Sequence, residues 1–278
     1  MQAVATQLEK ALAFRALHAR DRAFLIPNPF DVGTAKLLEH LGFEALATTS
    51  AGYAFTLGLH DNRVDRDVML RHVADLAAAT SLPVSADLEN GYGDAPEDCA
   101  RTIQLAAQAG LAGGSIEDAT QRPDDPIYEI NFAAERVRAA AEAAHALPFP
   151  FTLTARAENF INGRPDLPDT IARLQAFQQA GADVLYAPGL TTREDIAAVV
   201  RSVDRPVNVV MGLSGAQLSL KELSALGVKR VSVGSALSRA ALGAFLRAAR
   251  EMLDAGTFEF AKEAVSYREV NDLFGRTN

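Results

Sequence analysis

The 278-residue sequence has a single cysteine, Cys99, and no tryptophan. One cysteine excludes an internal disulfide framework and any metal site built from several cysteines. The sequence also lacks a block of lysine and arginine and carries a formal net charge of −8, so we expect no nucleic-acid partner. Of the histidines, only His60 falls in a segment predicted to join a strand to a helix. This argues against a histidine metal site and against a Ser-His-Asp triad.

Long apolar runs are also missing. A membrane-spanning helix needs roughly 18 or more consecutive apolar residues, and no run approaches that length. The first 22 residues carry charges throughout, which is typical of an amphipathic helix rather than of a secretory signal peptide. We therefore expect no membrane association and a cytoplasmic location.

Short apolar runs alternate with longer alanine-rich segments that have helical spacing. The runs predicted to be strands are 24–27, 45–49, 83–87, 114–118, 151–155, 183–187, 206–211 and 230–234. The segments predicted to be helices are 31–41, 65–79, 96–109, 129–144, 167–179, 192–203, 219–226 and 236–255. Several of these helices are followed by glycine, the usual residue just past a helix C-terminus.

Strand–helix units of this kind favour parallel strands joined by crossover helices. A (β/α)8 barrel fits both the number of units and the chain length, and an open doubly wound sheet is the alternative. No G-x-G-x-x-G motif follows the first strand, which argues against a dinucleotide-binding sheet. No linker interrupts the pattern. We expect residues 1–278 to form one domain, with an N-terminal helix and one further helical segment at 258–275.

Charged residues gather where several predicted strands end, and barrel active sites lie at the C-terminal ends of their strands. The third strand ends in Asp87 with Glu89 just beyond it, the fourth leads to Glu117, and Arg156 closes the fifth. Paired acids of one sign are unfavourable unless something compensates them. One interpretation is a set of structural salt bridges with Arg156. The other is a divalent-cation site, because all-oxygen ligands select a hard ion such as Mg²⁺ or Mn²⁺.

Arg156 itself has two interpretations. Its guanidinium could be a structural partner of Glu117 or Glu158, or it could bind a substrate carboxylate through two parallel hydrogen bonds. Cys99 lies within a predicted helix, at least a turn beyond a strand end, and we interpret it as a packing residue rather than a nucleophile.

Several of these stretches resemble the isocitrate lyase/phosphoenolpyruvate mutase superfamily. The stretch SADLENGYGD is similar to its D-x-D-x-G-Y/F-G signature, with Glu89 in place of the second aspartate. ATTSAGYAFTLGLHD resembles the loop after the family's second strand, with its acidic residue at Asp61. SIED and LTARAEN match the glutamate of strand four at Glu117 and the arginine of strand five at Arg156. The resemblance runs from about residue 24 to residue 239.

The resemblance implies a (β/α)8 barrel, a Mg²⁺ or Mn²⁺ ion near Asp87, and a small 2-oxo-acid or dicarboxylate substrate. It implies a homo-oligomer, dimer or tetramer, in which the C-terminal helix packs on or is exchanged with a neighbouring subunit. The metal ligands that it implies, direct or through water, are Asp87, Glu89 and Glu117. The catalytic residues that it implies are Arg156, Asp61 and Glu117. The substrate-binding residues that it implies are Thr49, Ser50, Ala51, Arg156 and Asn208.

The sequence also departs from the family pattern. Lyases of the family carry a K-K/R-C-G-H loop after the fourth strand, and its cysteine is the catalytic acid. Here residues 119–126 read ATQRPDDP and include no cysteine, lysine or histidine. The lysine- and asparagine-bearing loop of the phosphonate-processing members is missing as well, and Pro188 stands where mutases place a histidine.

We therefore expect a Mg²⁺-dependent lyase that acts on a small 2-oxo acid or a 2-hydroxy di- or tricarboxylate through an enolate. Carbon–carbon cleavage or an oxaloacetate-type decarboxylation fits best, because decarboxylation needs little beyond enolate stabilisation and a proton. One alternative is a phosphonate C–P hydrolase or a phosphoenolpyruvate mutase-like enzyme. The other is a non-catalytic 2-oxo-acid-binding protein that kept the metal platform.

Overall fold

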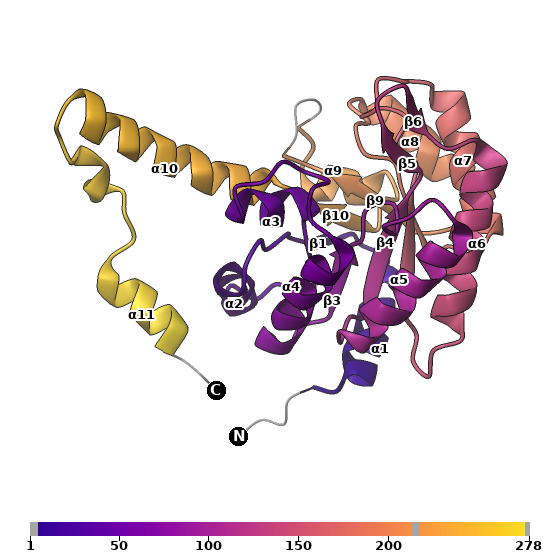
Figure 1. The fold of residues 1–278 in the computed structure, drawn as a ribbon, viewed down its shortest axis with the longest axis horizontal. Coiled ribbons are helices and arrows are strands. Elements are labelled where there is room, and N and C mark those ends of the chain that lie inside the picture. The colour runs from indigo at the N-terminus through magenta and orange to yellow at the C-terminus, as the bar shows by residue number, and fades with distance from the viewer. Residues whose placement is uncertain (1–4, 213–216, 276–278) are drawn as a thin grey trace.

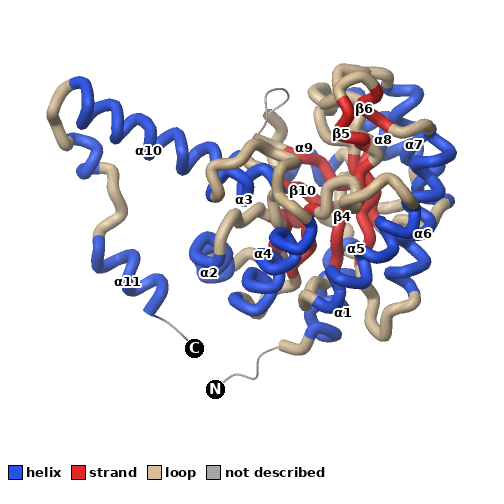
Figure 2. The backbone as a smooth tube through the Cα atoms, in the orientation of Figure 1, coloured by secondary structure: helices blue, strands red, loops and turns tan. Residues whose placement is uncertain are grey.

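The computed structural model describes residues 5–212 and 217–275 and shows parallel strands surrounded by helices (Figure 1, Figure 2). The strands pair in the order β1-β10-β9-β8-β7-β4-β3-β2, and every pair is parallel. Each overlaps one predicted strand. Their bounds are β1 (Phe24–Ile26), β2 (Leu46–Ala47), β3 (Val84–Asp87), β4 (Gly113–Glu117), β7 (Thr152–Arg156), β8 (Val184–Tyr186), β9 (Val207–Val210) and β10 (Arg230–Ser232).

The two ends of this strand order meet, so the sheet closes into a barrel. Ala47 N donates a hydrogen bond to Pro27 O at 3.1 Å, which joins β2 to the end of β1. The side chain of Asn28 adds two more links, because its Nδ2 donates to Thr48 O (2.9 Å) and its Oδ1 accepts from Val233 N (2.9 Å). The (β/α)8 prediction is confirmed, and the open doubly wound alternative is wrong.

All the helices predicted between the strands are present, and several begin with a side-chain cap. The side chains of Asp31, Thr192 and Ser219 each accept a hydrogen bond from a backbone N–H in the first turn. Within residues 5–212 and 217–275, no helix has the length and apolar character needed to cross a bilayer. The bounds are α2 (Val32–His40), α4 (Arg66–Ala79), α5 (Pro96–Gln108), α6 (Ile130–His145), α7 (Leu167–Gln179), α8 (Arg193–Ser202), α9 (Leu220–Ala225) and α10 (Ala236–Asp254).

Three features were not predicted from the sequence. A short helix, α3 (Ser50–Thr56), follows β2, and an antiparallel hairpin of β5 (Ala119–Arg122) and β6 (Asp125–Ile127) follows β4. The single helical segment expected at 258–275 is wrong, because the chain forms a 3-10 turn, η1 (Glu259–Lys262), and a separate helix, α11 (Tyr267–Gly275). Both the short helix and the hairpin lie next to the strand ends where the candidate site was predicted.

The N-terminal helix α1 (Gln7–His18) closes the end of the barrel at which the strands begin. Its residues Phe14 and Leu17 are buried in a cluster with Phe24 and Ile26 of β1. Gly113 of β4 makes this packing possible, because a Cβ there would lie 2.9 Å from Phe14 Cε1. The predicted N-terminal helix is confirmed over these residues, while its first four residues lie outside the described chain.

Helix α10 extends away from the barrel instead of covering it (Figure 1). Of its residues only Ser238 is buried, while the side chains of Phe245 and Leu253 are 69% and 85% exposed. The chain then turns back through η1, and α11 contacts α2. The helix that follows the last strand therefore leaves much of its apolar surface in solvent.

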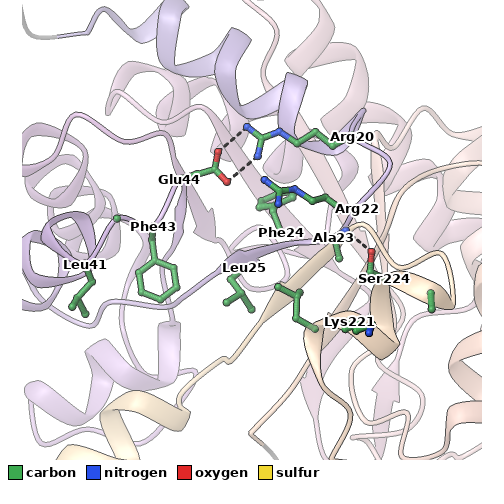
Figure 3. Close-up of a pocket in the computed structure, with 13 residues that line it drawn as sticks. Arg20, Arg22, Ala23, Phe24, Leu25, Leu41, Phe43, Glu44, Lys221 and Ser224 are labelled. Atoms are coloured by element: carbon green, nitrogen blue, oxygen red, sulfur yellow. Dashed lines mark hydrogen bonds and ion pairs between the residues drawn. The ribbon is translucent and has the colours of Figure 1, made fainter.

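An apolar groove lies on the barrel beside β1, between α2 and α9 (Figure 3). Its volume is about 840 Å³, and Leu25, Leu41, Phe43 and Lys221 are among its lining residues. An ion pair between Arg20 and Glu44 (2.7 Å) lies at its edge. Leu25 belongs to β1 and is still 39% exposed, so no helix of the described chain covers this side of the strand.

We predict that His18 makes the protein less stable in mild acid. Burial, together with the charge of Arg230, lowers the pKa of His18 to about 3 from 6.5. Below pH 6.5 the unfolded chain therefore binds a proton that the folded chain does not, and stability falls with pH. One such group accounts for about 2 kcal/mol between pH 8 and pH 5. Urea unfolding of His18→Gln should show that much less acid sensitivity than the wild type.

The exposed His60 provides the matched control for this measurement. His60→Gln should keep the wild-type dependence of the unfolding free energy on pH. An unchanged pH dependence in His18→Gln would contradict the assignment of this acid sensitivity to His18.

Candidate active site

A cavity of about 450 Å³ lies at the ends of the strands where the chain leaves the barrel for the loops. The cavity brings together all but one of the predicted site residues, which come from five different strands and the segments that follow them. Those that line it are Thr49, Ser50, Ala51, Asp61, Asp87, Glu117, Arg156 and Asn208. The exception is Glu89, which does not line the cavity and contacts Gln121, a residue of its wall.

The guanidinium of Arg156 lies among three carboxylates. Its Nη1 is 2.8 Å from Asp87 Oδ1, its Nη2 is 3.1 Å from Glu117 Oε2, and its Nε is 2.8 Å from Glu158 Oε1. The Tyr186 ring lies 5.3 Å from the guanidinium carbon. One guanidinium therefore faces three carboxyl groups, so the salt bridges expected from the sequence are present. The carboxyl groups outnumber the cationic group that binds them.

Burial acts strongly on these groups. Desolvation alone would lower the pKa of Arg156, but the charges of Glu158, Glu117 and Asp87 outweigh it and raise that pKa well above its usual value. Desolvation raises the pKa of Glu117 well above its usual value and that of Glu158 to about 7. Arg156 thus stays charged, while burial disfavours the ionised forms of Glu117 and Glu158.

The turn that begins α3 contacts the second oxygen of Asp87. Ser50 Oγ donates to Asp87 Oδ2 at 2.9 Å, and Ser50 N lies 3.4 Å from the same oxygen. Ser50 Oγ is also 3.3 Å from Asp61 Oδ1. Burial and the charge of Asp87 raise the pKa of Asp61. The hydroxyl of Thr49 accepts from Gly52 N (3.1 Å) as the cap of α3, so Thr49 shapes the turn.

Glu89 is held beside this group by its backbone. It has a positive φ of 50°, and its N–H lies 3.3 Å from Asp87 Oδ1. Its Oε2 accepts from Gln121 Nε2 at 3.0 Å, whereas its buried Oε1 has no hydrogen-bond partner. Desolvation, with the charge of Asp87, raises the pKa of Glu89 to about 8. An unpaired buried oxygen of this kind requires a proton, a water or a cation.

Asn208 belongs to a polar row that crosses adjacent strands in register. Arg230 pairs with Asn208, Asn208 with Tyr186, and Tyr186 with Arg156. Asn208 Oδ1 accepts from Arg230 Nε (2.8 Å) and its Nδ2 donates to Ser232 Oγ (3.0 Å). These two bonds fix the orientation of the amide and leave one N–H of Nδ2 for a ligand.

The oxygen donors around the cavity fit a hard divalent cation. In the described chain no three Asp, Glu, His or Cys side chains surround one point closely enough to bind an ion on their own. Mg²⁺ usually takes only one or two protein carboxylates and keeps several waters, so such a cluster is not required. The unpaired Oε1 of Glu89 and the excess of carboxylates around Arg156 both favour a cation at this position.

Cys99 lies outside this cavity on α5, as expected. Its Sγ is 3.6 Å from Asn90 O, and burial raises the pKa of the thiol to about 11. The side chain is therefore a protonated packing group at neutral pH, and the structure gives it no contact with the cavity wall.

Sequence reasoning missed the contributions of Gln121 and Arg230 to the site, whereas it named Glu158 as a possible partner of Arg156 and the structure shows that contact. Arg230 begins a predicted strand two residues before Ser232, and strand alternation places both on the same inward face. Gln121 gave no signal of its own, because it lies in a segment expected to be a loop without catalytic groups.

Comparisons with known proteins agree with this geometry. The family model described as phosphoenolpyruvate phosphomutase matches residues 14–253. A solved structure from Burkholderia cenocepacia J2315, provisionally classed as a lyase/mutase, is 66% identical, covers 98% of each chain and has a TM-score of 0.96. Oxaloacetate decarboxylase of Paraburkholderia xenovorans (strain LB400) is 30% identical over 80% of this chain and 74% of its own. Phosphonopyruvate hydrolase, solved with oxalate and Mg²⁺, is 25% identical over 96% and 95%, with a TM-score of 0.85. The chain belongs to the phosphoenolpyruvate phosphomutase family of the isocitrate lyase/phosphoenolpyruvate mutase superfamily.

Proposed function

We propose that the protein is a Mg²⁺-dependent lyase that cleaves a carbon–carbon bond of a small 2-oxo acid, with decarboxylation of an oxaloacetate-like substrate as the leading reaction. The observation that carries this proposal is the set of carboxyl groups around Arg156, which outnumber its single guanidinium. A divalent cation would offset the excess, and a 2-oxo acid is a natural chelator of such an ion.

The similarity to an oxaloacetate decarboxylase and to a hydrolase solved with oxalate and Mg²⁺ supports this choice of substrate and ion. Oxaloacetate and oxalate are both small dicarboxylates, and a cavity of about 450 Å³ holds a ligand of that size.

Asp87 is the residue we propose to hold the ion most directly, with Glu89, Glu117 and Asp61 acting directly or through water. When bound, Mg²⁺ would supply positive charge where an enolate oxygen develops. Mn²⁺ would serve in the same place, because the donors are all oxygens.

The chain's own residues would orient the substrate. Arg156 spends three of its five N–H groups on carboxylates, and the remaining two can donate to a substrate carboxylate. The α3 turn, with Ser50 and the backbone N–H groups near Ala51, would hold the other end of the chelating group. Asn208 presents its free N–H from the opposite wall.

The segment after β4 favours decarboxylation over other lyase reactions. The hairpin of residues 119–127 carries no cysteine, lysine or histidine that could act as an acid. Decarboxylation releases CO2 without protonating it, and the electron pair of the broken bond stays on the enolate, whose carbon can take its proton from water. Phosphonate C–P cleavage is the second candidate, because phosphonopyruvate hydrolase shares the fold. A metal-dependent binding protein without turnover is the third.

Turnover measurements distinguish the three candidates. We expect release of CO2 from oxaloacetate above the rate of a blank with Mg²⁺ alone, abolished by EDTA and restored by Mg²⁺ or Mn²⁺.

Asp87→Ala should lower kcat/KM at least about a hundredfold, in the range of a lost charge-stabilising group. Glu89→Ala should have a smaller effect, since Asp87 lines the cavity and Glu89 does not. The buried, protonated Cys99 is the control, and Cys99→Ser should stay within a few-fold of wild type.

Phosphate release from phosphonopyruvate would favour the second candidate. Metal-dependent binding of 2-oxo acids without any product would favour the third. Equal binding of oxalate in EDTA and in Mg²⁺ would refute the metal site.

We predict that Arg156→Lys binds oxalate at least about tenfold more weakly than wild type. One ammonium cannot serve three carboxylates and also donate two parallel hydrogen bonds to a ligand. A lost bond to a charged group is worth about 1.5–3 kcal/mol, or roughly ten- to a hundredfold in affinity. Calorimetry in Mg²⁺ measures the effect, and circular dichroism checks the fold. Arg122→Lys, a matched change on the exposed hairpin, should leave the affinity unaltered, and unchanged affinity in Arg156→Lys would exclude the clamp.

We also propose that the chain forms a homo-oligomer in which α10 of one subunit covers the groove beside β1 of another. Two unpaired surfaces of this chain support the exchange: an apolar helix with little cover, and a groove between α2 and α9 of about 840 Å³ (Figure 1, Figure 3). The groove lies where the helix that follows the last strand would pack to complete the ring. Exchange of α10 between subunits would bury the apolar surface of the helix and cover the groove at the same time.

Light scattering coupled to gel filtration tests this assembly. Wild type should elute with at least twice the 29.6 kDa mass of the chain. Phe245→Asp should lower the mass to that of one chain, because Phe245 is a large exposed apolar side chain of α10. Arg250→Asp on the same helix is the control for added negative charge, and a monomeric wild type would refute the exchange.

A further inference from the structure

Gln121 occupies an unusual place in the hairpin that follows β4. The hairpin lies beyond the end of β4, at the opposite end of the barrel from α1 (Figure 2). Gln121 lines the cavity, and its Nε2 lies 3.0 Å from Glu89 Oε2 and 3.4 Å from Asn62 Oδ1. Nε2 donates to both atoms, and because the amide oxygen of Asn62 can only accept, the NH2 side of the carboxamide faces this pair. One side chain thus joins three segments that are distant in the sequence.

The backbone of all three residues is in the left-handed region. Gln121 has a φ of 62°, Glu89 of 50° and Asn62 of 59°. Within the described ranges, only one other non-glycine residue, Tyr92, has a positive φ. Such conformations are unfavourable for residues with a Cβ, and they persist where the surrounding structure enforces them, often at functional sites. The three residues contact one another through the carboxamide of Gln121.

The two oxygens of Glu89 differ in their surroundings. Gln121 binds Oε2, while Oε1 is buried without a hydrogen-bond partner, and the residue as a whole is 3% exposed. A side chain free to rotate about its last bond would change the direction in which each oxygen points. The bond from Gln121 fixes the plane of the carboxyl group and so keeps the other oxygen in one position.

The hairpin does not depend on Gln121 for its own position. Arg122 forms ion pairs with Asp94 (3.0 Å) and Asp125 (3.3 Å), and the hydroxyl of Tyr128 also donates to Asp94. A change at Gln121 should therefore remove its bond to Glu89 without displacing the hairpin.

We propose that Gln121 is a positioning residue for the divalent cation, acting through Glu89. The carboxamide fixes the plane of the carboxyl group through Oε2, so that Oε1 can accept from a water of the ion in one defined direction. This inference rests on the proposed metal site and adds to it a residue of the hairpin, which carries no cysteine, lysine or histidine.

Mn²⁺ binding without substrate tests the role of Gln121 separately from turnover. Electron paramagnetic resonance measures free Mn²⁺, and Gln121→Leu should raise the Kd about tenfold, the usual effect of removing a residue that orients a metal ligand. Gln104→Leu makes the same replacement at an exposed position on α5 and should leave the Kd unchanged.

A double-mutant cycle identifies the route of the effect. If Gln121 acts through Glu89, Gln121→Leu should have no further effect on the Kd in the Glu89→Gln background. Equal losses in both backgrounds would show that Gln121 does not act through Glu89. A wild-type Kd in Gln121→Leu would overturn the inference while leaving the metal site intact, and absence of Mn²⁺ binding by the wild type would overturn both.

Discussion

The guanidinium of Arg156 is the interaction on which the site depends. It comes from the end of β7 and reaches carboxylates of β3, β4 and its own loop, at distances of 2.8–3.1 Å. Without it, Asp87, Glu117 and Glu158 could not remain so close together in a buried setting. With it, the site still holds more carboxyl groups than cationic groups, which supports our proposal of a cation there. Three N–H groups of Arg156 bind carboxylates and two are left for a ligand, so this side chain both holds the site together and can contact a substrate.

The hairpin of β5 and β6 determines which side chains the candidate active site receives from the segment after β4. The K-K/R-C-G-H loop of the family pattern is absent here, and the segment supplies an amide and a set of surface ion pairs instead. An amide orients its neighbours but does not exchange protons. We therefore infer that the site can stabilise negative charge, while the hairpin offers no side chain to protonate a leaving group. Such a site favours a substrate that loses a neutral fragment.

The barrel and most of its site follow from local sequence patterns. Runs such as Val207–Val210 are rich in β-branched residues, several helices such as α7 and α9 are followed by glycine, and polar residues at strand ends place Asp87, Glu117 and Arg156 around one cavity. The hairpin could not be predicted, because ATQRPDDPI has two prolines and few apolar residues, and its shape comes from contacts with Asp94. The position of Glu89 behind Gln121 depends on a positive φ, which periodicity does not reveal. Tertiary contacts decide both.

Asn28 carries a consequence for how the chain folds. Its Oδ1 accepts a hydrogen bond from Val233 N, 205 residues later, and this bond helps to close the barrel. Contacts between residues so far apart in the sequence form late in folding, because closing the long loop between them costs conformational entropy first. During synthesis β1 cannot pair with β10 until nearly the whole chain has left the ribosome, so one edge of β1 stays unpaired. Incomplete chains therefore expose edges that can pair with one another, so the yield of soluble protein should depend on protection during translation.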